Sequence, residues 1–297
     1  MSETNPSIGS PSDAPILRVS VILIAFNQAP ALRRALEALE RSQNRAEFEI
    51  VVVDCGSSDG SAGLDSHFPA VNMMRLPHHV GAVRAMNIAT RTAKADLLFY
   101  LSPDVEVAPD TVKALADALE AESDTVAAVV PVFVDGSGQV IPKAFRLPDR
   151  AAVEAVAKGE SLPTIPIAAG SEPVQVECAS LDALMIRKSF IRSMNYFDQR
   201  YGHSWADVEL AMQVQKASKK IRVLPGIPVT YHAAPDPLAG DSMKRLDRVD
   251  GAAEFLGKYR GGAFGFRLGM ALGALAKFDF GGFAGILGGT KLDGGMK

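Results

Sequence analysis

The sequence FEIVVVDCGSSDGS at residues 48–61 joins an apolar, β-branched run to a turn made of acids, hydroxyls and glycines. An almost continuous apolar run is typical of a strand that is covered on both faces of its sheet. Residues Val19–Ala25, which read VSVILIA, have the same character. Because buried strands of this kind belong to parallel sheets, the turn that starts at Asp54 is expected at the carboxyl edge, where such sheets bind ligands.

Strand and helix patterns alternate around this stretch. Further strands are expected at residues 71–76, 96–101 and 126–133, and helices after Pro30 and at residues 81–93 and 109–122. This alternation predicts an α/β fold with a mostly parallel sheet and helices on both of its faces. A second polar turn, Ser102-Pro103-Asp104, follows the strand at 96–101 and therefore lies at the same edge of the sheet.

The second half of the chain has a weaker pattern. Residues 135–173 read as a hairpin and a mobile loop rather than as a domain boundary. One or two strands are expected at 174–186, a helix at 205–216, and two short strands at 222–224 and 229–232. From Asp247 the pattern becomes helical and then rich in glycine.

Composition excludes several classes of protein. The chain has 297 residues, 47% of them hydrophobic and 22% charged, with a net charge of −3, which excludes a broadly basic nucleic-acid binder and global disorder. No apolar run reaches the length of about 18 residues that a membrane span needs. Cys55 and Cys178 are too few for a disulfide framework or a four-cysteine zinc site. With no signal-peptide pattern at the start, the expectation is a reduced, cytoplasmic protein.

Three acidic segments could carry chemistry, and each has a plain structural alternative. The turn from Asp54 can bind a base or a ribose, or it can be a loop that caps the next helix. Asp104 can hold a divalent cation that takes a diphosphate, or it can belong to an ordinary turn. Asp207 opens a helix, either as a partner of the helix dipole or as a general base at the mouth of a pocket.

Histidines give weaker signals. His232 ends a short strand, where a lone histidine is more often structural than a ligand. His78 and His79 are adjacent to each other near a turn, and we expect both to be solvated.

Taken in order, these segments resemble the family 2 glycosyltransferases of the GT-A fold, a Rossmann-like architecture. The segments are VSVILIAFNQAPALRRALEAL, EIVVVDCGSSDGS, HVGAVRAMNIATRTAKADLLFYLSPDVEV, ASLDALMIRKSFIRSMNYFDQRYG, ADVEL and VTYH. The similarity is greatest to a bacterial branch of rhamnosyltransferase-like and galactofuranosyltransferase-like enzymes, and it fades after His232. We therefore expect a disordered lead-in at residues 1–15, a GT-A catalytic domain at 16–240 and a C-terminal helical, glycine-rich extension at 241–297.

The resemblance implies which residues bind the nucleotide sugar. Asp54 would contact the base and Arg84 the diphosphate, while Asp59 would shape the loop together with Gly60. The positions that match this part of the family are Ala25, Asn27, Asp54, Asp59, Gly60, Gly81, Arg84 and Asn87.

It also implies the catalytic and metal positions. Asp207 matches the general base of inverting members, Asp104 the last acid of the metal-binding DxD, and His232 a position that can complete the metal site. Ser102 stands where the first acid is usual, which weakens the binding of the expected Mg²⁺ or Mn²⁺. An inverting transfer needs one base and a charge sink for the leaving diphosphate, and Asp207 and the cation at Asp104 would supply them.

The resemblance implies a nucleotide-diphosphate sugar as donor, and a cell-envelope or surface glycan, which can be lipid-linked, as acceptor. Three departures keep a catalytically degenerate member open as an alternative: Ser102 replaces the usual first acid of the DxD, Ala206 replaces the usual Glu, and Cys55 replaces the usual Asn or Asp. Such a member would bind nucleotide sugar or a partner protein. A nucleotidyltransferase is ranked low, because residues 26–30 lack its glycine-rich, basic loop.

The glycine-rich tail carries an apolar stripe whose role stays open. A helix with this stripe could pack on the catalytic domain, lie on the inner face of the membrane, or meet a second subunit. The stripe consists of Phe264, Leu268, Leu272, Leu275 and Phe278.

Overall fold

The first two strands show how local sequence dictates the fold. The computed structural model describes residues 16–168, 170, 172–233 and 241–290, so the lead-in expected at 1–15 lies outside the described residues. β1 (Val19–Ala25) and β2 (Phe48–Asp54) are almost completely buried. They pair in parallel register from Val19 with Phe48 to Ala25 with Asp54. α1 (Ala29–Glu40) connects them and has a proline in its first turn, as the sequence predicts.

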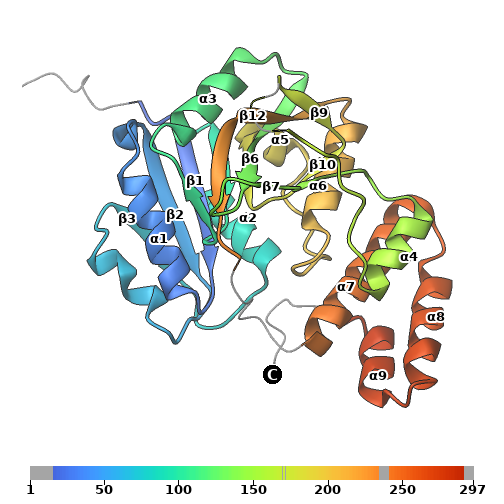
Figure 1. Cartoon of the computed structure of the whole chain (residues 1–297). Coiled ribbons are helices and arrows are strands. Elements are labelled where there is room, and N and C mark those ends of the chain that lie inside the picture. Colours follow the sequence, from blue (N-terminus) through green and yellow to red (C-terminus); the bar gives the residue numbers. More distant parts are fainter. Residues whose placement is uncertain (1–15, 169, 171, 234–240, 291–297) are drawn as a thin grey trace, which may run out of the picture.

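A ten-stranded sheet forms the centre of the described chain (Figure 1). Its main path runs β3-β2-β1-β4-β11-β6-β12-β5. The additional strands on this path are β3 (Val71–Arg75), β4 (Leu97–Leu101), β5 (Val105–Val107), β6 (Val126–Val134), β11 (Ala183–Arg187) and β12 (Lys220–Tyr231). Strands β3, β2, β1, β4, β6 and β12 run in one direction, and only β11 and β5 on this path run against them. The predicted mostly parallel sheet is confirmed.

Helices cover both faces of this sheet. α1 and α3 (Thr111–Ala121) pack with one core, and α2 (Ala82–Thr92), α5 (Lys188–Ser193) and α6 (Ala206–Lys216) pack with the other. Alternation along β4 shows the two faces directly, because Leu98 and Tyr100 join one core while Phe99 and Leu101 join the other. The α/β fold is therefore confirmed, and β1, β2 and β4 end at a common edge.

The region after β6 differs from the prediction in three places. Residues 150–158 form a helix, α4 (Arg150–Lys158), where a loop was expected; Asp149 caps its start and Gly159, with φ 111°, ends it. Residues 174–187 contain β9 (Val174–Val176), β10 (Cys178–Ala179) and β11, rather than one or two strands. The two short strands expected at 222–232 are one strand, β12, with a shift of register between Leu224 and Pro228 that accommodates the prolines.

Short strands complete the architecture. β7 (Val140–Ile141) pairs with β6 in the expected hairpin, β9 pairs with β12, and β8 (Ala144–Phe145) pairs with β10 in a separate two-stranded sheet.

The C-terminal extension is a helical lobe beside the sheet (Figure 1). It comprises α7 (Asp241–Phe255), a π-helical turn η3 (Leu256–Arg260), α8 (Ala263–Leu275) and α9 (Phe280–Gly288). α7 contacts α4, α8 and α9. In the part of the chain that the structure describes, no helix combines the length and apolar character needed to cross a membrane.

Candidate functional site

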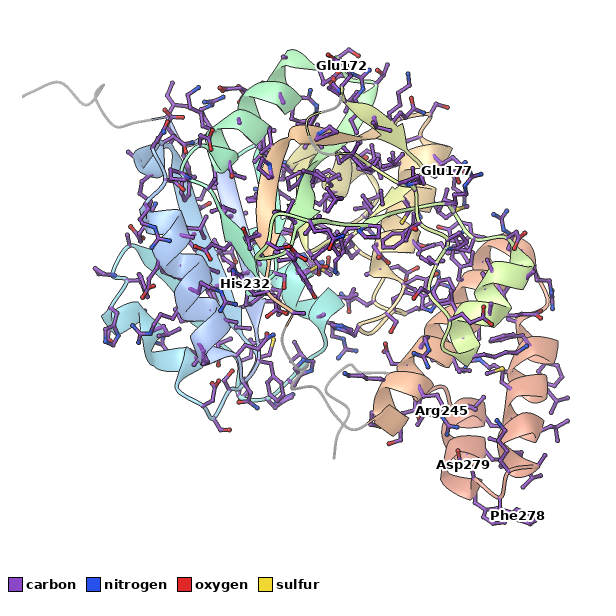
Figure 2. The ribbon with its side chains drawn as sticks, viewed as in Figure 1. Glu172, Glu177, His232, Arg245, Phe278 and Asp279 are labelled. Atoms are coloured by element: carbon purple, nitrogen blue, oxygen red, sulfur yellow. The ribbon has the colours of Figure 1, made fainter. Side chains whose placement is uncertain are left out.

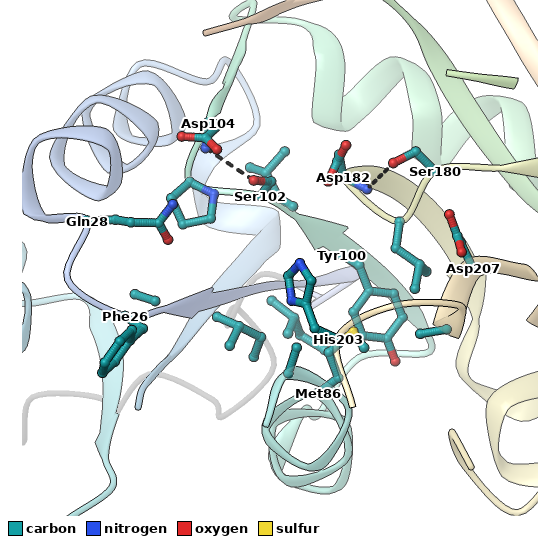
Figure 3. Close-up of a pocket in the computed structure, with 18 of the residues that line it drawn as sticks. Phe26, Gln28, Met86, Tyr100, Ser102, Asp104, Ser180, Asp182, His203 and Asp207 are labelled. Carbon is teal, nitrogen blue, oxygen red and sulfur yellow. Dashed lines mark hydrogen bonds between the residues drawn. The ribbon is translucent and has the colours of Figure 1, made fainter. Parts of the chain in front are cut away.

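A cavity of about 450 Å³ opens at the carboxyl edge of the sheet, where the two polar turns were predicted (Figure 3). Its lining comes from the ends of β1, β4 and β12, the segment before β11, α2 with the residues before it, and the start of α6 with the residues before it. The polar and aromatic residues in this lining are Phe26, Gln28, His79, Tyr100, Ser102, Asp104, Ser180, Asp182, His203, Ser204, Trp205, Asp207 and Tyr231. Two predicted residues, Asp104 and Asp207, thus meet in one cavity although they are distant in sequence.

The turn after β4 presents Asp104 to this cavity. The Asp104 N–H donates to Ser102 Oγ at 3.3 Å, so this serine serves to shape the turn. The His232 N–H donates to Asp104 O at 2.8 Å, which places the end of β12 beside the turn. However, His232 Nε2 lies 2.9 Å from Glu106 Oε2, and His232 does not line the cavity. The structure therefore brings the backbones of Asp104 and His232 together but gives the imidazole another partner.

The donor set around Asp104 fits a cation that arrives with its phosphates better than a preformed metal centre. Among the described residues, no group of three or more His, Cys, Asp or Glu side chains could hold a metal ion. Mg²⁺ commonly binds through one or two carboxylates together with substrate phosphates, and the Asp104 carboxylate and the Ser102 hydroxyl supply hard oxygen donors of that kind.

Asp207 lies in the first turn of α6, on the cavity wall. Its Oδ1 accepts a hydrogen bond from the Val208 N–H at 2.8 Å. The helix cap itself is Trp205, which has a left-handed φ of 75°, so Asp207 does not cap the helix, although as an acid in the first turn it still suits the helix dipole. Burial raises the pKa of the Asp207 carboxyl, and the charge of Asp182 raises it further. A carboxylate with a raised pKa is a stronger base, which suits proton abstraction near neutral pH.

Asp182 is a cavity residue that sequence reasoning missed. Its Oδ2 lies 2.7 Å from Lys143 Nζ, and that ammonium lies 4.0 Å from the centroid of the Tyr231 ring. Burial acts to lower the pKa of Lys143, but the Asp182 carboxylate outweighs this effect and raises it, so the lysine stays charged. The available signal was an acid directly before the apolar strand at 183–187, at the same edge as the other turns.

The opposite end of the cavity carries apolar and aromatic surface. Ala25 lines it together with Phe26 and His79, whose rings meet edge to face at a centroid distance of 4.9 Å. His79 is buried because its Nδ1 accepts the Gly81 N–H at the start of α2. The expectation of a solvated His79 is therefore wrong, whereas His78 is exposed as expected.

Asp54 ends β2 and is buried. One carboxylate oxygen accepts the Ser57 N–H at 3.1 Å, while Oδ1 has no hydrogen-bond partner among the described residues. Asp54 is not part of the cavity lining. A buried acceptor without a donor is costly unless a ligand supplies one, and the role in binding a base that the resemblance implies stays a prediction.

Asn27 and Asp59 tie the polar turn to the start of α1. Asn27 Oδ1 accepts the Ser58 N–H at 2.8 Å, and Asp59 accepts the N–H of Ala29 at 2.7 Å and that of Ser61 at 3.0 Å. Although burial acts in the opposite direction, these bonds hold the pKa of Asp59 below its ordinary value. Asp59 thus shapes the loop as implied, and Gly60 has the left-handed φ of 96° that the turn needs. Asn27 holds the loop and does not line the cavity.

The α2 residues are placed differently from what the resemblance implies. Both side-chain polar atoms of Asn87 bond to the backbone of Phe197, at 2.9 and 3.0 Å, so Asn87 fastens α2 to that segment. Gly81 starts α2 with φ 89°, and Arg84 is exposed one turn later. None of the three lines the cavity.

Comparisons with known proteins agree with this geometry. Residues 20–189 match the model of glycosyl transferase family 2. A relative from Mycobacterium tuberculosis (strain ATCC 25618 / H37Rv), described as N-acetylglucosaminyl-diphospho-decaprenol L-rhamnosyltransferase, is 26% identical over 235 residues, which are 72% of this chain and 76% of the relative.

Solved glycosyltransferase structures share the fold. GalNAc-T7 with UDP, GalNAc and Mn²⁺ superposes with a TM-score of 0.65 at 18% identity; the match covers 82% of this chain but only 50% of that one. The mannosyltransferase PcManGT from Pyrobaculum calidifontis, in complex with GDP-Man and Mn²⁺, gives a TM-score of 0.57 at 18% identity, covering 97% of this chain and 77% of that one. With the family model matching more than half of the chain and the fold shared with these structures, the protein belongs to glycosyl transferase family 2 and is a glycosyltransferase with the GT-A fold.

Proposed function

We propose that the protein is an inverting, metal-assisted glycosyltransferase that uses a nucleotide-diphosphate sugar and employs Asp207 as general base. The observation that carries the proposal is the presence of Asp104 and Asp207 in one cavity, with the pKa of Asp207 raised by burial. Asp207 accepts the proton of the acceptor hydroxyl, and that oxygen attacks the anomeric carbon from the side opposite the diphosphate. The bond from the anomeric carbon to the diphosphate breaks, and the nucleoside diphosphate leaves with the electron pair.

The donor base binds near the carboxyl ends of β1 and β2. The unpartnered Asp54 Oδ1 accepts an N–H of the base, and the ring pair of Phe26 and His79 offers an apolar surface for it. A thermal-shift panel of UDP-, GDP- and dTDP-sugars, with and without Mn²⁺, tests this assignment, because a specific ligand raises the melting temperature by mass action. A panel without any shift would contradict it.

A divalent cation, Mg²⁺ or Mn²⁺, would be held by Asp104 and the donor's diphosphate, and when bound it neutralises charge on the leaving group. Support comes from the Mn²⁺ in the complexes of the two fold neighbours and from the hard oxygen donors of the turn. Ser102 in place of an acid makes this site weaker. His232 joins it only by leaving Glu106, and Arg84 is an exposed cation on α2 that can assist the diphosphate.

A cell-envelope glycan on a lipid carrier is the proposed acceptor, in analogy with the decaprenol-linked substrate in the mycobacterial relative's name. In the described part of the chain, every exposed large apolar side chain except Ile16 belongs to residues 263–288, which we call the α8–α9 hairpin. Figure 2 shows Phe278 at the tip of this lobe. The exposed set is Phe264, Leu268, Leu272, Leu275, Phe278, Phe280 and Leu287, which contains the whole predicted stripe.

Charge on the hairpin fits a lipid surface better than a polar partner. Arg267 is paired with Asp250 and Glu254, and Asp279 is paired with Arg245, so these charges are neutralised locally. Lys277, at the tip, is exposed and suits anionic head groups. We therefore place the hairpin on the membrane surface, with pairing to a second copy as the competing outcome.

A catalytically degenerate member is the second candidate. Ser102, Ala206 and the absence of a three-donor metal group among the described residues favour it. Calorimetry with nucleoside diphosphates separates the two candidates: metal-independent binding without any transfer of sugar would support the degenerate member.

A further inference from the structure

The C-terminal helix α7 holds the loop that leads to the proposed base. This loop, Gly202–Trp205, is called here the 202–205 loop, and three of its residues line the cavity. Asp247, in α7, is 1% exposed. Its carboxylate accepts the His203 N–H at 3.2 Å and the Ser204 N–H at 2.8 Å. A single buried carboxylate thus satisfies two consecutive backbone donors immediately before α6, in the manner of a helix cap supplied from another element.

Trp205, the last residue of the loop, is fixed by the same helix. Its Nε1–H donates to Arg248 O at 3.0 Å, and its ring lies 5.5 Å from that of Phe255. A Cβ atom at Gly251 would lie 2.5 Å from Trp205 Cδ1, so α7 can approach this closely only with glycine there. These contacts stabilise the left-handed backbone of Trp205, from which α6 begins and Asp207 follows two residues later.

The extension also contacts α6 at Glu209, two residues after Asp207. Glu209 is 1% exposed, and its Oε1 accepts hydrogen bonds from Lys258 Nζ at 2.6 Å and Tyr259 Oη at 2.9 Å. Both donors belong to the π-helical turn after α7. The segment that carries Asp207 is therefore fastened on either side by one continuous stretch of the C-terminal extension.

We propose that Asp247 is a positioning residue for the transfer reaction, because its carboxylate sets the conformation of the 202–205 loop and thereby the place of Asp207 in the cavity. The contacts that position the base then extend past residue 240, the boundary that the sequence suggests for the catalytic domain, to Asp247 in α7 and to Lys258 and Tyr259 in η3. This inference rests on the proposed role of Asp207 as general base. The α8–α9 hairpin is not needed for it.

Steady-state kinetics of Asp247→Ala and Asp247→Asn in the full chain test the proposal. Displacement of a reacting group by about 1 Å can cost about 100-fold in rate, so we expect kcat of Asp247→Ala to fall by about 10–100-fold and the KM for the donor to stay within about twofold. Asp247→Asn keeps one acceptor oxygen and should retain an intermediate kcat. If Asp247→Ala does not fold, Asp247→Asn alone tests the proposal.

The pH profile separates positioning from a general loss of structure. Loosening the loop admits water to Asp207 and removes the burial that raises its pKa, so the acid limb of kcat should move to lower pH in the Asp247 variants. The matched control is Asp250→Asn, a buried acid in the same helix whose carboxylate pairs with Arg267 of α8. Its kcat and its acid limb should be those of the wild type.

Two results would overturn the proposal: wild-type kcat in folded Asp247→Ala or Asp247→Asn, or an equal loss of kcat in Asp250→Asn. If the proposed role of Asp207 as general base is wrong, Asp207→Asn will transfer sugar at the normal rate. That result distinguishes a failure of the proposed function from a failure of the positioning role of Asp247.

Discussion

Lys143 Nζ lies 2.7 Å from Asp182 Oδ2, and Asp182 shares a cavity wall with Asp207. The ion pair partly neutralises a carboxylate whose charge raises the pKa of the proposed base. The cavity thus contains two acids in different surroundings. The carboxylate of Asp182 is paired with a lysine, whereas burial raises the pKa of Asp207. Two neighbouring acids in different environments can take different roles in one reaction.

Removal of this lysine should shift the pH dependence of transfer. In Lys143→Met the Asp182 charge is no longer compensated, so the pKa of Asp207 should rise further and the acid limb of kcat should move to higher pH. The pH–rate profile measures this shift, with Lys113→Met, which breaks an exposed pair with Asp117, as the control. An unchanged profile in Lys143→Met would show that the pair does not influence the base.

Loss of the Asp54 carboxylate should weaken nucleotide binding. A hydrogen bond to a charged group is worth about 1.5–3 kcal/mol, so Asp54→Ala should bind the nucleoside diphosphate about 10–100-fold more weakly. Isothermal titration calorimetry gives the affinity, and Asp65→Ala, at an exposed acid paired with Arg75, serves as the control. Equal affinity in Asp54→Ala and the wild type would remove Asp54 from the binding site.

The ionised carboxylate of Asp207 should lower the free energy of unfolding at neutral pH. The pKa of Asp207 is higher in the folded state than in the unfolded state, so the folded protein binds this proton more tightly. The free energy of unfolding therefore falls as the pH rises from the pKa of the unfolded state to that of the folded state, and it stays lower above that pH. Asp207→Asn should therefore melt at a higher temperature than the wild type at pH 7 and lose this advantage below about pH 4, near the unfolded pKa. Each kcal/mol moves the melting temperature of a large domain by about 2–4 °C, which calorimetry resolves. A lower melting temperature at pH 7 would contradict the raised pKa.

The exposed phenylalanines of the α8–α9 hairpin should mediate binding to vesicles. Phe278 is 83% exposed and Phe280 66%, so the double variant Phe278→Ser/Phe280→Ser should lose most of the binding to phosphatidylglycerol vesicles in a sedimentation assay. Ile16→Ser, at a strongly exposed apolar side chain outside the α8–α9 hairpin, should bind as the wild type does. If the double variant binds vesicles as the wild type does, the hairpin does not bind the membrane. If instead the wild type is a dimer and the double variant is a monomer, the hairpin pairs with a second copy.

The sequence predicted the fold well where its signals are local. The apolar run at Val19–Ala25 and the proline near the start of α1 are sufficient to specify strand and helix, and the structure reproduces both. α4 was missed although Asp149 and Gly159 mark its two ends, since the helix is short and buries only Val153 and Ala157. The structure has one strand, β12, where two were predicted at 222–224 and 229–232. This continuity depends on pairing with β6 and on a shift of register, which are tertiary features.

The position of a site residue was predictable where the residue stands at the boundary of an element: Asp104 follows β4 and Asp207 opens α6, and both line the cavity. Asp182 was missed although it directly precedes the apolar strand at 183–187, and its partner Lys143 is 39 residues away in sequence. The contact of Asn87 with the backbone of Phe197 could not be predicted, because the two residues are 110 positions apart and no local pattern reveals the pairing. Asp247 likewise acts through a loop more than 40 residues earlier.

The most direct test of the central claim is transfer of sugar by Asp207→Asn. General base catalysis contributes about 10²–10⁴-fold, so kcat should fall by that factor while the affinity for the nucleoside diphosphate stays within about twofold. Asp110→Asn, at the exposed start of α3 where the side chain makes no capping bond, should keep wild-type activity. Transfer at the wild-type rate by folded Asp207→Asn would contradict the account and move the base to another residue of the cavity.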